Sequence, residues 1–162
     1  MTISESLLPE FEHEMLNTRK MLETVPDGKF DWRPHPKSMA LGRLASHVCE
    51  MAQWGDVIVR QEKLELSADM TPFVAETRAE LVEALDRNVA AAREAIAGAS
   101  DEALLKPWTL SFAGNEIFTM PRIAALRAMA LSHVIHHRGQ LSVYLRLLDV
   151  PIPGMYGPSA DA

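Results

Sequence analysis

Two histidines spaced four apart in a long apolar stretch are the residues of this chain best suited to chemistry. The segment from Pro121 to Asp149 reads PRIAALRAMALSHVIHHRGQLSVYLRLLD and contains His133, His136 and His137. An α-helix turns by about 100° per residue, so His133 and His137 lie on one face, in line with apolar residues. A buried imidazole costs free energy unless it has a partner, and a metal ion can serve two neighbouring imidazoles at once.

Two interpretations of this pair stay open on spacing alone. One is an interior helix whose histidines bond to carbonyls or side chains, which is the more common situation for a single core histidine. The other is a metal site, because helical metal sites use the i, i+4 spacing. Val134 follows His133, where the HExxH motif of zinc proteases has glutamate. Zinc protease chemistry is therefore not expected.

A second pair, His47 and Glu50, forms an H-x-x-E sequence in an earlier apolar stretch. His47 lies at the edge of the predicted apolar face, and both side chains are spaced to reach one ion. For Glu50 we favour a different role, either as a solvated residue or as the partner of an arginine from the last helix, because carboxylates are rarely buried without a partner.

These residues must be positioned by helices, because the apolar residues recur at spacings of three and four. The periodicity predicts four long helices, over residues 4–24, 38–64, 78–98 and 121–149. A long link over 66–76 joins the second and third helices, and the proline-rich tail after Asp149 is expected to be an extended arm. Four long helices in a chain of 162 residues indicate an all-α four-helix bundle with a single domain, 1–162.

The segment 107–119, PWTLSFAGNEIFT, has a different pattern. Trp108, Leu110 and Phe112 alternate with polar residues, and Ala113-Gly114-Asn115 is typical of a turn. This pattern predicts a small β-hairpin or an ordered loop just before the last helix.

Charge and composition exclude several classes of partner. The formal net charge is −6, and all of it comes from residues 1–98, which hold 17 acidic and 11 basic residues. The last helix has four arginines and no carboxylate between Pro121 and Leu148. We expect these arginines to pair with acids of other helices rather than form an anion-binding stripe. Without an extended basic patch, nucleic acid is not an expected partner.

The location of the protein is also suggested by the sequence. The first residues, MTISESLLPEFEHE, lack the basic and apolar regions of a signal peptide. Arg127 and Arg138 interrupt the longest apolar stretch, so no membrane span is expected. A single cysteine, Cys49, excludes a disulfide within the chain. These features predict a cytoplasmic protein.

Three segments resemble the DinB-like family of bacterial four-helix bundles. They are PDGKFDWRPHPKSMALGRLASH, SHVIHHRGQLSVYLRLL and VPIPGMYGPSAD, and they span nearly the whole chain. The resemblance implies that a histidine triad, falling on His47, His133 and His137, holds one divalent metal ion. It also implies a long connection between the second and third helices, and a homodimer. His136 falls off the metal-binding face, and we assign it to an outer or an interface role.

The resemblance suggests two classes of function. Three imidazoles leave at least one coordination position open, which is the arrangement of a catalytic site. The first hypothesis is a metal-dependent enzyme, using zinc or nickel, that transfers a low-molecular-weight thiol to a small electrophile, with Arg127 or Arg138 holding a substrate carboxylate. The second is a metal-binding protein without turnover, for sensing or storage. A metal-dependent hydrolase is less favoured, because Glu50 is the only candidate for a general base near the triad.

A homodimer is expected from the last helix itself. Its surface away from the triad line carries no charge at Ala125, Met129, Ser132 and Val143. A helix that is apolar nearly all round must be covered on both sides. We therefore expect this face, or one adjoining it, to meet a second copy of the chain.

Overall fold

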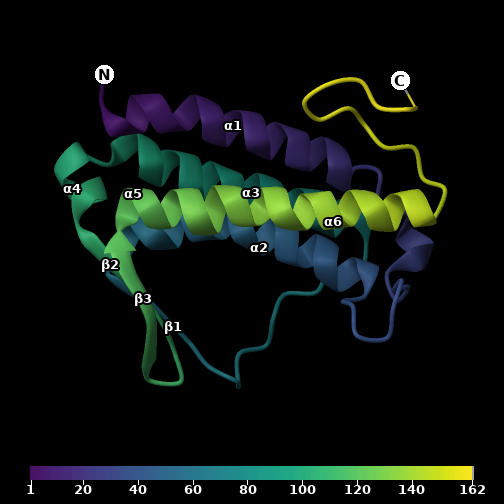
Figure 1. Cartoon of the computed structure of the whole chain (residues 1–162), viewed down its shortest axis with the longest axis horizontal. Helices are drawn as coiled ribbons and strands as arrows, with labels where there is room; N and C mark the ends of the chain where they lie inside the picture. Colours follow the sequence, from purple (N-terminus) through teal and green to yellow (C-terminus); the bar gives the residue numbers. More distant parts are fainter. Residues whose placement is uncertain (162) are drawn as a thin grey trace.

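Long helices lying side by side form the body of the molecule, which is a computed structural model describing residues 1–161 (Figure 1). Their bounds are α1 (Ile3–Leu22), α2 (Leu41–Arg60), α3 (Arg78–Gly98) and a final helical run comprising α5 (Arg122–Ala125), η2 (Leu126–Ser132) and α6 (His133–Leu147). Thr2 and Glu5 form a capping box at the start of α1, and Thr77 caps α3 as the sequence predicts. The helical bundle expected from the sequence is confirmed.

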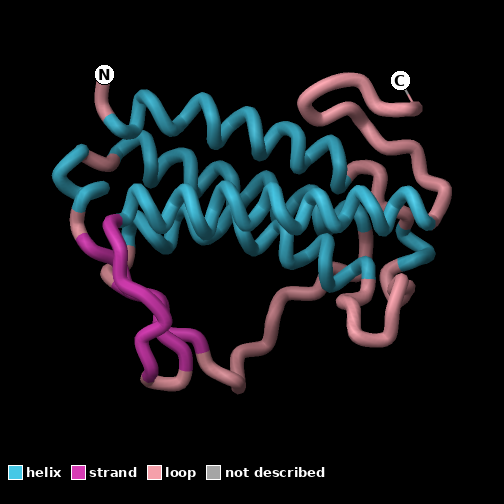
Figure 2. Tube along the Cα trace, in the orientation of Figure 1, coloured by secondary structure: helices cyan, strands magenta, loops and turns pink. Residues whose placement is uncertain are grey.

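A three-stranded sheet stands at one end of the helices (Figure 2). Its strands are β1 (Lys63–Leu66), β2 (Pro107–Phe112) and β3 (Asn115–Pro121), in the order β1-β2-β3. Strands β2 and β3 form an antiparallel hairpin whose turn, Ala113-Gly114, has positive φ angles of 49° and 79°. The predicted hairpin is therefore confirmed.

Strand β1 corrects the predicted second helix, which was expected to cover residues 38–64. Helix α2 ends at Arg60, and Lys63–Leu66 pairs in parallel with β2, with Lys63 opposite Thr109. The backbone hydrogen bonds of this pairing outweigh the local helical preference of the segment.

The start of α2 is also later than predicted, at Leu41 instead of Ser38. The preceding loop supplies carbonyl oxygens to the first amides of the helix: Leu41 donates to Trp32 at 2.8 Å and Gly42 donates to Phe30 at 2.9 Å. These bonds satisfy donors that a helix start leaves free, so the extended residue Ala40 is the N-cap.

Short helices, loops and the C-terminal arm make up the rest of the described chain. They include η1 (Asp27–Lys29) and α4 (Asp101–Leu105), which Ser100 caps. Residues 67–77 form the long connection between β1 and α3. The C-terminal arm, residues 150–161, turns back toward α1 in extended form, as predicted, and Asn17 of α1 donates to the carbonyl of Met155 at 3.2 Å (Figure 1).

The core lies between the helices and extends beneath the sheet. Its large, fully buried side chains include Phe11, Leu44 and Trp108. Gly55 permits the close approach of α2 to α3, because a Cβ atom there would lie 2.7 Å from the Cβ of Ala92. Cys49 is buried, and burial raises the pKa of its thiol to about 12, so this cysteine is an inert core residue.

The last helical run is not the single continuous α-helix predicted over 121–149. Residues 126–132 (η2) adopt π-helical hydrogen bonding, and α6 begins at His133. A π-segment has more residues per turn than an α-helix, and such segments are frequent at functional sites.

No helix within residues 1–161 combines the length and the apolar character that crossing a membrane requires.

Candidate metal centre

Three histidine side chains converge between α2 and α6. His47 comes from α2, His133 and His137 come from α6, and one ring nitrogen from each lies within 4.8 Å of the other two. The ring centroids are 5.4 Å apart for His47 and His133, 4.6 Å for His47 and His137, and 4.7 Å for His133 and His137. The structure thus brings together all three residues that the sequence assigns to the triad.

Two of the three imidazoles are oriented by an outer hydrogen bond. Nδ1 of His47 lies 2.9 Å from Oε2 of Glu50, and Nδ1 of His137 lies 2.8 Å from Oε1 of Gln140. Each oxygen accepts the Nδ1 proton, so the lone pair of Nε2 is available toward the centre. Metal-binding histidines commonly have such outer partners. Sequence reasoning missed Gln140, although it stands three residues after His137 just as Glu50 stands three after His47.

The third imidazole, His133, has no outer hydrogen-bond partner among the described residues. Its Nε2 lies 2.9 Å from Nε2 of His137, and its Nδ1 is buried without a partner among residues 1–161. Two nitrogen lone pairs at this distance repel unless a proton or a cation lies between them. The ring is held by packing, with the indole of Trp54 edge-on at 6.3 Å between centroids. The donor set therefore fits a metal ion.

The histidines favour the neutral state that metal binding requires. Burial, followed by the nearby His137, His47 and His136, lowers the pKa of His133 to about 4. Burial, followed by its histidine neighbours, also lowers the pKa of His137, although the bond to Gln140 opposes this. At neutral pH these two rings are therefore uncharged, and each has one nitrogen lone pair with which it can bind a metal ion.

Glu50 has a different partner from either of those favoured from the sequence. Its Oε2 accepts a hydrogen bond from Arg43, on the same helix, at 2.9 Å as well as the bond from His47. Burial raises the pKa of Glu50, but the bonds from His47 and Arg43 outweigh this and leave the pKa lowered. The carboxylate is thus ionised, half-buried and part of the centre, rather than solvated or paired with an arginine of the last helix.

The two arginines expected to hold a substrate carboxylate are engaged elsewhere. Arg138 is 3% exposed and donates to the carboxylate of Glu14, itself 8% exposed, at 2.6 Å. Arg127 is exposed and pairs with Glu10 of α1 at 2.9 Å. This part of the sequence interpretation is wrong. The general expectation that these arginines pair with acids of other elements is confirmed for both.

His136 lies beside the centre but outside it. Its side chain is exposed, its ring centroid is 4.9 Å from that of His137, and it is absent from the group of converging nitrogens within residues 1–161. The ring is positioned away from the metal-binding face, as its place in the helix predicts.

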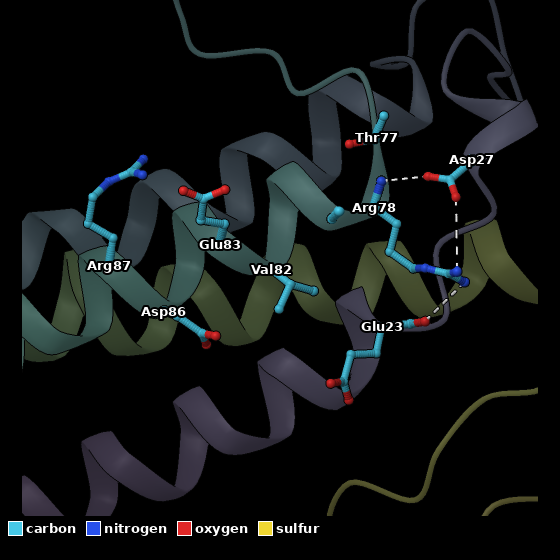
Figure 3. Close-up of a pocket in the computed structure, with 9 residues that line it drawn as sticks. Glu23, Asp27, Thr77, Arg78, Val82, Glu83, Asp86 and Arg87 are labelled. Atoms are coloured by element: carbon cyan, nitrogen blue, oxygen red, sulfur yellow. Dashed lines mark hydrogen bonds and ion pairs between the residues drawn. The ribbon is translucent and has the colours of Figure 1, made fainter.

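A surface hollow where α1 meets α3 offers a contrast (Figure 3). It is lined by charged residues that bind each other: the amide of Arg78 donates to Asp27 at 2.6 Å, and its guanidinium reaches the carbonyl of Glu23 at 3.5 Å. These pairs fasten the start of α3 to the end of α1. The hollow contains no member of the histidine triad.

Known proteins share the sequence and the fold of this chain. A curated relative, the uncharacterized protein YrdA of Bacillus subtilis (strain 168), is 26% identical over 97% of this chain and 90% of its own length. The crystal structure of a DinB-like protein from Bacillus cereus ATCC 10987 is 25% identical, with a TM-score of 0.73, and covers 96% of this chain and 98% of that one. A DinB-like protein from Bacillus subtilis (YjoA) shares the fold at 16% identity, with a TM-score of 0.70, over 95% of this chain and 99% of its own.

The family model that matches is that of the DinB family, and the match runs over residues 1–162. The segments that suggested this family from the sequence hold the three converging histidines on α2 and α6. The chain belongs to the DinB family.

Proposed function

We propose that this protein binds one divalent transition-metal ion through Nε2 of His47, His133 and His137. The observation that carries the proposal is the convergence of one ring nitrogen from each of the three histidines, all within 4.8 Å of one another. An ion at this point would bind all three nitrogens, in place of the single hydrogen bond between Nε2 of His133 and Nε2 of His137 at 2.9 Å. Neutral imidazoles suit zinc and nickel, which are the ions we expect.

The charge around the centre favours an anionic ligand. Three neutral imidazoles leave the charge of a divalent ion uncompensated. The negative charge of Glu50 is shared with the guanidinium of Arg43, at 2.9 Å. A thiolate would compensate the ion better than a neutral ligand, and three protein ligands leave a position for it.

For the reaction we propose transfer of a low-molecular-weight thiol to a small electrophile. A divalent ion held by the triad would supply Lewis acidity and favour the thiolate form of the thiol. Glu50 and Gln140 hold the rings of His47 and His137 in place, and Trp54 forms an apolar side of the centre. In the transfer, the thiol releases its proton to solvent, its sulfur bonds to the electrophilic carbon, and the leaving group departs with the electron pair.

Two other functions would use the same centre. Metal binding without turnover, in sensing or storage, needs the triad alone. Hydrolysis additionally needs a free general base, and Glu50 is already held by His47, Arg43 and the amide of Phe73. This occupancy favours thiol transfer over hydrolysis. The cytoplasmic location expected from the sequence would place the centre among reduced thiols.

Metal analysis of the purified protein, followed by a thiol panel with an electrophilic acceptor, tests this function. We expect one zinc or nickel ion per chain, thiol-dependent product formation, and loss of both in His133→Ala. Stoichiometric metal with no product from any thiol would instead support sensing or storage. Absence of bound metal, together with failure to bind added zinc or nickel, would overturn the proposal.

We also propose that a second copy of the chain covers α6, although the predicted face needs revision. Ala125 is buried in the core of its own chain and cannot contribute. Val143 and Leu147, one turn apart, are both 58% exposed. These two side chains would be the apolar centre of the surface that a second copy covers. Sedimentation at micromolar concentration should show a dimer, and Val143→Glu should shift it to a species of 18.0 kDa.

A further inference from the structure

The carboxylate of Glu50 joins the histidine centre to a distant part of the chain. Its Oε2 accepts the bond from His47, and its Oε1 accepts a hydrogen bond from the backbone amide of Phe73 at 2.9 Å. Phe73 belongs to the connection between β1 and α3. One side chain therefore contacts a candidate metal ligand on one oxygen and a loop backbone on the other.

Residues 67–76, most of that connection, form a segment that we call the strap. Two further bonds from α2 hold it: Arg43 donates to the carbonyl of Phe73 at 3.3 Å, and the hydroxyl of Ser46 accepts from the amide of Ala75 at 2.9 Å. All three anchoring side chains lie within one turn of His47. The side chains that hold the strap and the side chain that orients His47 thus come from the same short stretch of α2.

The strap has little apolar burial of its own to hold it. Met70, Phe73 and Val74 are exposed, and only Ala75 joins the core. Segments with few buried apolar contacts open at low free energy. The order of the strap therefore depends on the hydrogen bonds from Arg43, Ser46 and Glu50.

A metal ion on Nε2 would strengthen this anchoring. Coordination draws electron density from the imidazole and makes its Nδ1–H a stronger donor, so the bond to Glu50 becomes more favourable. A carboxylate held more firmly fixes the amide of Phe73 more firmly. The effect is reciprocal, because any coupling free energy between two events acts in both directions.

We propose that Glu50 couples metal binding at His47 to the order of the strap, so that loading the centre strengthens the attachment of residues 67–76 to α2. The proposal rests on the proposed metal binding. It assigns Glu50 the role of a positioning residue, and it makes the strap a segment that loosens when the ion leaves.

Hydrogen–deuterium exchange of the full chain, with and without zinc, tests the coupling. We expect the amides of Phe73 and Ala75 to exchange at least several-fold more slowly with zinc bound, while α3 amides stay unchanged. If wild-type protein binds zinc and nickel in titrations but exchange in the strap is unaffected by either ion, the coupling is wrong and the proposed metal site stands. If neither ion binds, the proposed function itself fails.

The variant Glu50→Gln tests the two hydrogen bonds that Glu50 accepts, one from His47 and one from the amide of Phe73. An amide offers one acceptor oxygen, and its NH2 group would face an N–H donor at the other position, so both bonds cannot be kept. Zinc affinity should fall by about 10–100-fold, the range for removal of an outer partner. At saturating zinc, the added protection of the strap should be lost. Unchanged zinc affinity together with unchanged strap protection would overturn the proposal.

Two control variants test the effect of losing a negative charge and the effect of losing one hydrogen bond to the strap. Glu83→Gln removes an exposed carboxylate on α3 and should alter neither zinc affinity nor exchange. Ser46→Ala removes the bond to Ala75 without touching His47, so the strap should exchange faster in both states. Zinc should still slow its exchange in Ser46→Ala, because the link through Glu50 remains. Loss of the zinc effect in this variant would contradict the assignment to Glu50.

Discussion

His137 and Arg138 are neighbours in sequence but lie in two contrasting polar clusters on different sides of α6. The cluster around Arg138 has many hydrogen bonds: its guanidinium donates to the carbonyl and the carboxylate of Glu14, to Thr18 and to Tyr156. The hydroxyl of Tyr156 completes the network by donating to Glu14 at 2.7 Å. In the histidine cluster, Nδ1 of His133 is buried without a partner among residues 1–161, and the Nε2 atoms of His133 and His137 lie 2.9 Å apart.

The difference separates structure from function. A buried ion pair that is hydrogen-bonded to its neighbours can persist as part of the fold, whereas a buried polar group without a partner costs free energy. The network of Arg138 fastens the C-terminal arm to α1 and α6. The triad, by contrast, presents converging ring nitrogens that a metal ion could bind.

The largest effect is expected from breaking the complete cluster. Arg138→Met leaves the carboxylate of Glu14 buried without its partner, which should lower the free energy of unfolding by about 3–5 kcal/mol. Arg127→Met, which breaks an exposed pair with Glu10, is the matched control and should cost less than about 1 kcal/mol. Urea denaturation of the metal-free proteins measures both. Equal costs would show that burial of the Arg138 pair does not matter.

Substitutions in the histidine cluster should instead lower the affinity for zinc. Alanine at His47, His133 or His137 should lower zinc affinity by more than about 100-fold, beyond the loss expected for an outer partner. His136→Ala should lie within about 10–100-fold at most, because its ring is outside the converging group. Competition titrations with a chromophoric chelator compare the four variants. Abolished binding in His136→Ala with intact binding in His137→Ala would refute the ligand assignment.

Removal of the hydroxyl that completes the Arg138 network should have a smaller effect. Tyr156→Phe deletes bonds to two charged groups and should cost about 1–3 kcal/mol. Tyr144→Phe deletes a neutral bond to the carbonyl of Met39, at 3.2 Å, and should cost about 1 kcal/mol or less. Thermal and urea unfolding measure the difference. If zinc affinity changes in Tyr156→Phe, the two clusters are not independent.

The pH dependence of stability distinguishes the clusters further. The pKa of His133 is lowered to about 4 in the fold from 6.5, so between these values the unfolded chain binds more protons at this ring. Stability of the metal-free protein should therefore fall as pH decreases from about 6.5 toward 4. His133→Gln should flatten this part of the curve, and His35→Gln, an exposed control, should not. A wild-type curve identical to that of His133→Gln would contradict the lowered pKa.

The smallest effect is expected on the helical content of the protein when the ion is removed. The core lies between α1, α2, α3 and α6 and does not need the centre, so metal should add stability by linkage rather than create the fold. Circular dichroism before and after chelation should show the same helical signal. Loss of most of that signal would mean that the triad organises the fold.

The histidine triad and the long helices could be predicted from the sequence because their signals are local or belong to the family pattern. Apolar spacing located α1 and α3, and a T-x-x-E sequence located the start of α3. The β2–β3 hairpin was predictable from an alternation and a turn that lie within one short segment. The identity of the reaction has no comparable local signal.

The failures concern partners far away along the chain. Arg138 finds Glu14 on α1, at the other end of the sequence, and no spacing rule indicates that pairing. Strand β1 forms because β2 lies beside it, although its own residues continue a helical pattern. Glu50 differs, because its partners Arg43 and His47 are on the same helix. The prediction that an arginine of the last helix is its partner is wrong.

The parallel pairing of β1 with β2 also sets an order of assembly. Lys63 lies opposite Thr109, and the whole of α3 and α4 separates them along the chain. Contacts between such distant segments carry a large loop-closure entropy and form after local ones. A newly made chain would therefore complete its helical hairpins first and add β1 to the sheet late. During synthesis, residues 63–66 therefore stay unpaired until β2 has emerged from the ribosome.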